Sequence, residues 1–73
     1  MNATITFSER AGKVEYHNIC IKVNDKELKM RVTTEDGVAS EWNSRYNEGE
    51  KWNKLSSDEK EAINKEILSY FNY

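Results

Sequence analysis

One short segment near the end of the chain constrains how the whole second half can fold. Ser56 stands three residues before Glu59, so its hydroxyl can accept a hydrogen bond from the Glu59 amide while the Glu59 carboxylate accepts one from the Ser56 amide. Asp58 and Glu61 add negative charge to the first turn, where the positive end of a helix dipole favours it. This capping box predicts a helix over about residues 57–72.

Apolar residues recur through this segment at helical spacing. Ile63, Ile67, Tyr70 and Phe71 share one stripe, and we expect Ile63, Ile67 and Phe71 to face the core. Leu68 lies off the stripe, so we expect it to face a second contact or a partner molecule.

The first half of the chain alternates apolar and polar residues with the period of two that is typical of β-strands. Gly12 and the pair Asn24-Asp25 interrupt this alternation and predict turns. The inward-facing residues of the three predicted strands are Ala3, Ile5 and Phe7, then Ile19, Ile21 and Val23, then Leu28, Met30 and Val32.

In the second of these strands the apolar residues do not keep one regular alternation. Val14 and Tyr16 occupy even positions, whereas the apolar residues from Ile19 onward occupy odd ones, and a flat strand cannot send both sets to the same face. A β-bulge near His17-Asn18 would reset the alternation. Without that bulge, Val14 and Tyr16 would project from the solvent face.

Beyond the third strand the spacing changes to that of a helix. Val38, Trp42 and Tyr46 recur every four residues and predict a helix beginning near Gly37. Gly49 is expected to end or kink this helix, because glycine costs about 1 kcal/mol inside one. A single longer helix that runs through this glycine is the alternative.

Together these elements predict an α+β fold of order β-β-β-α-α, a three-stranded antiparallel β-meander followed by two helices packed on one face. A chain of 73 residues corresponds to one small domain, residues 1–73. Residues 1–33 would form its sheet and residues 37–73 its helices.

Composition narrows the class of protein. Charged residues make up 33% of the chain and hydrophobic residues 37%, which suits a globular protein and not a disordered one. Cys20 is the only cysteine, so no disulfide can form within the chain. We find no apolar run long enough for a signal peptide or a membrane span, and we therefore expect a cytoplasmic protein that does not contact a membrane.

The sequence contains few residues of the types that carry out catalysis. His17 and Cys20 are the only residues of their types, and a spacing of three sends them to opposite faces of a regular strand. One histidine and one cysteine cannot complete a zinc site, and the three isolated glycines form no phosphate-binding loop. We expect no metal, no cofactor and no enzymatic activity.

Charge is distributed unevenly along the chain. Residues 1–32 contain six basic and four acidic residues, whereas residues 33–73 contain five basic and nine acidic ones. Lys22, Lys29 and Arg31 alternate with core residues and would share the open face of the sheet, with Tyr16 near them. A nucleic-acid-binding module that uses this basic face is therefore one functional hypothesis.

The other hypothesis, which we prefer, is a small non-enzymatic binding protein whose partner is another protein. Occupying a surface of a host macromolecule would make it an inhibitor, of the kind that phages and mobile elements encode. A homodimer formed through the same surface or through a sheet edge is compatible with this interpretation. The expected partner-binding residues, all in the helical half, are Trp52, Tyr70 and Tyr73 as apolar anchors and Glu48, Glu50 and Glu61 as a polar rim.

Overall fold

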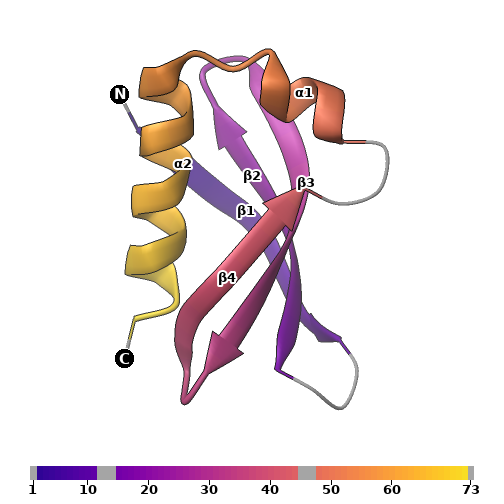
Figure 1. Ribbon diagram of the computed structural model, residues 1–73, viewed down its shortest axis with the longest axis vertical. Coiled ribbons are helices and arrows are strands. Elements are labelled where there is room, and N and C mark those ends of the chain that lie inside the picture. The colour runs from indigo at the N-terminus through magenta and orange to yellow at the C-terminus, as the bar shows by residue number, and fades with distance from the viewer. Residues whose placement is uncertain (1, 12–14, 45–47, 73) are drawn as a thin grey trace.

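The computed structural model describes residues 2–11, 15–44 and 48–72. An antiparallel sheet with the strand order β1-β2-β3-β4 is followed by a short helix and a longer one (Figure 1). The elements are β1 (Ala3–Ala11), β2 (Tyr16–Val23), β3 (Lys26–Glu35), β4 (Val38–Ser44), α1 (Gly49–Asn53) and α2 (Ser57–Tyr70). The expected α+β class and antiparallel meander are confirmed, whereas the expected number of strands is wrong, because the described residues form four strands and not three.

The fourth strand stands where the first of the two helices was predicted. Asp36 and Gly37 both have positive φ, 54° and 85°, which is the combination of a type I′ turn and reverses the chain within two residues. β4 then pairs antiparallel with β3. The helical spacing of Val38 and Trp42 is therefore overridden by the turn that precedes it, and Tyr46, the third residue of that stripe, lies outside the described residues.

α1 is a short helix between the sheet and α2. Gly49, expected to end or kink a helix, is instead the first residue of α1. Leu55, in the connection to α2, is buried, and Trp52 is half-buried against the core. This short segment therefore adds Leu55 and Trp52 to the core beside α2.

α2 begins where the capping box predicts. The Glu59 amide donates to Ser56 Oγ at 3.2 Å, and the Ser56 amide donates to Glu59 Oε1 at 2.9 Å. Ile63 and Ile67 are fully buried, as the stripe predicts. Leu68 is 46% exposed, so it faces away from the core as expected.

The core lies between one face of the sheet and the two helices. The sheet contributes the alternating residues of its two central strands, and α2 covers them from one side (Figure 1). The predicted inward direction of these strand residues is confirmed. The buried apolar residues are Ile19, Ile21, Val23, Leu28, Met30, Val32, Ala39, Leu55, Ala62, Ile63, Ile67 and Phe71.

The irregular alternation of the second strand is resolved differently from the prediction. β2 pairs with β3 without a register shift, so a bulge at His17-Asn18 is wrong. The shift lies in β1 instead, between Ile5 and Phe7. Tyr16 therefore projects from the open face, as expected for a strand without that bulge, while Val14 lies outside the described residues.

α2 also holds the two edge strands of the sheet. The Ile5 amide in β1 donates to Glu66 Oε2 at 3.1 Å, and the Ala39 amide in β4 donates to the Phe71 carbonyl oxygen at 3.2 Å. Unpaired edge amides are the groups through which sheets add further strands, so these bonds protect both edges. Neither described helix is long and apolar enough to cross a membrane.

Candidate functional site

No described helix or strand covers the face of the sheet opposite α2, and this face carries the basic residues that the sequence assigns to it. Lys22 projects from β2, and Lys29 and Arg31 from β3, each alternating with a buried neighbour. All three are exposed. Their expected placement away from the helices is confirmed, and we refer to this side of the sheet as the open face.

Arg31 is the most firmly positioned of these cations, because two neighbours on β2 hold it. Its guanidinium carbon lies 5.6 Å from the centroid of the Tyr16 ring, within the range of a cation–π interaction. Its Nε donates to Asn18 Oδ1 at 3.4 Å. The pair of Arg31 and Tyr16 thus forms a preorganised patch near the middle of the open face.

Phe7 adds an aromatic side chain to the open face that the sequence pattern assigned to the core. The register shift in β1 places it opposite Cys20, which in turn lies opposite Lys29 on β3. Its side chain is 50% exposed, so the prediction that it faces inward is wrong. The polar run after it, Ser8-Glu9-Arg10, is the only local sign that the apolar alternation of β1 stops here.

Carboxylates surround the cations on this face. Glu9 and Glu41 project from the edge strands, and Glu27 and Glu35 from near the two ends of β3. In the part of the chain that the structure describes, none of the three cations forms an ion pair within 4.0 Å. The open face therefore has a basic and aromatic centre, an acidic periphery and no net positive charge.

The helical residues proposed as anchors do not form one surface. Trp52 of α1 packs partly against the core, and Lys60 Nζ lies 5.8 Å from its ring centroid. Tyr70, at the far end of α2, is 51% exposed and packs edge-on against Phe71. Tyr73 lies outside the described residues. The 14-residue length of α2 thus separates Trp52 from Tyr70.

The carboxylates proposed as a polar rim are similarly dispersed. Glu48 is half-buried and pairs with Lys51 at 3.3 Å beside α1, where Glu50 is exposed. Glu61 is exposed on α2 and pairs with Lys65 at 3.2 Å. The exposed pair of Glu61 and Lys65, four residues apart on one helix, is typical of a solvated surface.

The two residues weighed as a catalytic pair face opposite sides of the sheet. Cys20 lies on the open face between Phe7 and Lys29, and its thiol is free. His17 lies on the helix side, where its ring centroid is 4.9 Å from that of Phe71. Among residues 2–11, 15–44 and 48–72, no group of three histidine, cysteine or acidic side chains is arranged to hold a metal ion.

No known protein family, no characterised protein and no solved structure matches the chain with significant similarity. Its function has to be inferred from its surfaces. The open face is the strongest candidate, since it combines exposed aromatic side chains, an arginine held by two neighbours, and cations that form no ion pair with any described residue.

Proposed function

We propose that the protein is a small non-enzymatic binding protein and that another protein docks on the open face of its sheet. The observation that carries this proposal is the exposure of Phe7 on the same face of the sheet as the pair formed by Tyr16 and Arg31. Aromatic and arginine side chains dominate the energetics of protein interfaces, because they bury large areas with little loss of conformational freedom. The sheet fixes these groups in position, so binding costs little ordering.

The charge arrangement supports a protein partner over nucleic acid. The carboxylates at the periphery, from Glu9 on one edge strand to Glu41 on the other, would lie close to any phosphate backbone that crosses the face. A protein can place carboxylates over Lys29 and Arg31 and basic residues over the periphery. The acidic sequence pI of about 5.4 points the same way.

Binding of this kind fits an inhibitor that acts by covering a surface of its target, as a phage or mobile element would encode. A reducing compartment such as the cytoplasm suits the free thiol of Cys20, which lies within the proposed interface. The more dispersed helical residues, including Tyr70 and Leu68, would form a separate and secondary contact.

Capture of the partner from nuclease-treated extract of the host cell tests the proposal. The immobilised wild-type chain is expected to retain one protein in constant ratio. Phe7→Ser and Arg31→Glu are each expected to weaken retention by about thirtyfold, since a central interface residue contributes about 2 kcal/mol. Lys54→Glu, which reverses an exposed charge outside the open face, is the matched control and retains the partner. Loss of the partner only on substitution of Leu68 or Tyr70 would contradict the proposal.

A nucleic-acid-binding module remains the second candidate because the cations of the open face lack ion-pair partners in the described structure and Tyr16 could stack on a base. Titration with a labelled oligothymidylate separates the candidates. Binding at low salt that falls steeply with salt and is lost in Lys29→Glu would favour nucleic acid. The protein-binding proposal predicts no binding to the oligonucleotide even at low salt.

A further inference from the structure

A hollow with both polar and apolar lining residues lies on the helix side of the sheet, at the C-terminal end of α2 and away from the open face. Its volume is about 310 Å³, near the lower limit of pockets that bind small molecules. It is lined by Arg10, Glu15, His17, Thr34, Gly37 and Phe71. Charged and polar side chains thus join the apolar ring of Phe71 on this face of the sheet where the helix ends.

Hydrogen bonds fix one wall of this hollow. Thr34 is buried, and both its amide and its hydroxyl donate to the backbone carbonyl of Glu15, at 2.8 Å and 3.2 Å. His17 Nε2 lies 3.4 Å from the same hydroxyl oxygen, and the imidazole packs at 51° against the Phe71 ring. The His17 ring, backed by the largely buried ring of Phe71, therefore forms an aromatic wall of the hollow beside the polar groups.

Opposite charges line the hollow without neutralising each other. Within the described residues, neither Arg10 nor Glu15 forms an ion pair within 4.0 Å. Arg10 offers donors to a carboxylate, since the planar guanidinium suits a carboxylate through paired hydrogen bonds. Glu15 offers an acceptor to an ammonium group, which the negative end of the α2 dipole also favours.

We propose that this hollow binds a small zwitterion with an apolar side chain, of the size and chemistry of a free aromatic amino acid. The carboxylate would lie against Arg10, the ammonium group against Glu15, and the apolar side chain against the His17 ring, where Phe71 also lines the hollow. This site shares no residue with the open face, so the proposal stands or falls independently of the protein-binding function.

Three probes of one shape separate the contributions of the charges. L-Phenylalanine carries both charges, phenylacetate only the carboxylate, and phenethylamine only the ammonium group. Titrated into the ¹⁵N-labelled full chain, L-phenylalanine is expected to bind about tenfold more tightly than either other probe, because each charge-assisted hydrogen bond contributes roughly one factor of ten. The amide shifts are expected at His17, Thr34 and Gly37.

Two charge-removing variants give opposite patterns. Arg10→Gln is expected to weaken L-phenylalanine and phenylacetate about tenfold and to leave phenethylamine unchanged, whereas Glu15→Gln is expected to weaken L-phenylalanine and phenethylamine and to leave phenylacetate unchanged. Lys54→Gln, outside the hollow, is expected to change none of the three. Equal affinity for L-phenylalanine and phenylacetate, no binding, or shifts that map outside the hollow would each overturn the proposal, provided that thermal unfolding shows the variants to be folded.

Discussion

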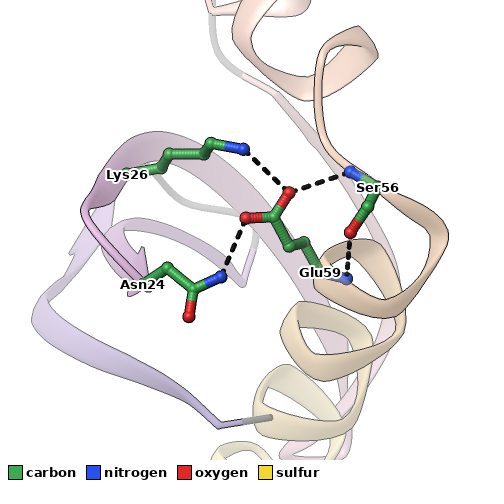
Figure 2. A network of polar contacts seen from close by, with 4 residues as sticks. All are labelled: Asn24, Lys26, Ser56 and Glu59. Carbon is green, nitrogen blue, oxygen red and sulfur yellow. Dashed lines mark hydrogen bonds and ion pairs between the residues drawn. The ribbon is translucent and has the colours of Figure 1, made fainter.

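Lys26 Nζ lies 2.8 Å from Glu59 Oε1 and joins the start of β3 to the first turn of α2 (Figure 2). The same carboxylate accepts a hydrogen bond from Asn24 Nδ2 at 3.0 Å and from the Ser56 amide at 2.9 Å. The side chain of Glu59 is only 6% exposed. Glu59 therefore caps α2 and also links α2 to the turn between β2 and β3.

This network predicts how stability depends on pH. The hydrogen bonds from Lys26, the Ser56 amide and Asn24 lower the pKa of Glu59 from 4.5 to about 2. A carboxylate whose pKa is lower in the folded state stabilises the fold above its unfolded pKa, and this stabilisation is lost as the pH falls from about 4.5 towards 2. Urea unfolding of the wild type at several pH values is expected to show that loss.

Glu59→Gln is expected to be less stable than the wild type at neutral pH and to have a flatter pH dependence between 4.5 and 2, because the group that titrates there is gone. Glu61→Gln removes an exposed carboxylate from the same helix and is the matched control, expected to keep the wild-type profile. Parallel profiles for Glu59→Gln and the wild type would show that the network does not govern acid unfolding.

The contrast between the two halves of this network shows what sequence can predict. The pairing of Ser56 with Glu59 is local, so the capping box and the start of α2 can be predicted from a four-residue pattern. Asn24 and Lys26 are separated from Glu59 by 35 and 33 residues, and their contacts exist only because the sheet and helix pack together. No local pattern predicts them.

The main error in the predicted fold, a helix in place of β4, has a physical origin in the pairing between strands. Val38 and Trp42 have helical spacing, but Asp36 and Gly37 form a two-residue turn, and pairing with β3 gives residues 38–44 the conformation of a strand. An Asp-Gly pair after a β-patterned run is a recognised hairpin signal, so this strand was predictable from the sequence.

Only some of the residues on the open face could be predicted from the sequence, because the position of one of them depends on packing between strands. Lys22, Lys29 and Arg31 alternate with buried residues in regular strands, so their exposure can be predicted from the period of two. Phe7 comes directly after a register shift, and the position of such a shift depends on cross-strand packing that the sequence of β1 alone does not contain.

The turn that begins β4 can be tested with a pair of glycine substitutions of expected opposite sign. Gly37 has a φ of 85°, so Gly37→Ala is expected to destabilise the protein by about 1–2 kcal/mol. A Cβ at Gly49 would meet no atom within 4 Å, and Gly49→Ala in α1 is expected to be neutral or to stabilise by up to about 1 kcal/mol. Chemical denaturation measures both, and an equal loss in the two variants would contradict the turn assignment.

The difference in burial along α2 predicts that two substitutions on this helix differ in their cost to stability. Ile63 is fully buried against the sheet, so Ile63→Ala is expected to cost about 2–5 kcal/mol of unfolding free energy. Leu68 is 46% exposed on the same helix, and Leu68→Ala is expected to cost about 0.5 kcal/mol or less. Similar losses from the two substitutions, measured by urea denaturation, would mean that Leu68 is covered in solution.

The bond between α2 and the edge of β1 makes a local prediction. The Ile5 amide donates to Glu66 Oε2 at 3.1 Å, next to the register shift that exposes Phe7. Glu66→Ala is expected to cost about 1 kcal/mol, the net value of one hydrogen bond, and to speed hydrogen exchange at the Ile5 amide in particular. Because an unprotected edge can pair with another chain, the variant is also expected to self-associate more readily at high concentration. Glu61→Ala on the same helix is the control, and unchanged exchange at Ile5 in Glu66→Ala would show that the edge of β1 is protected by something other than this carboxylate.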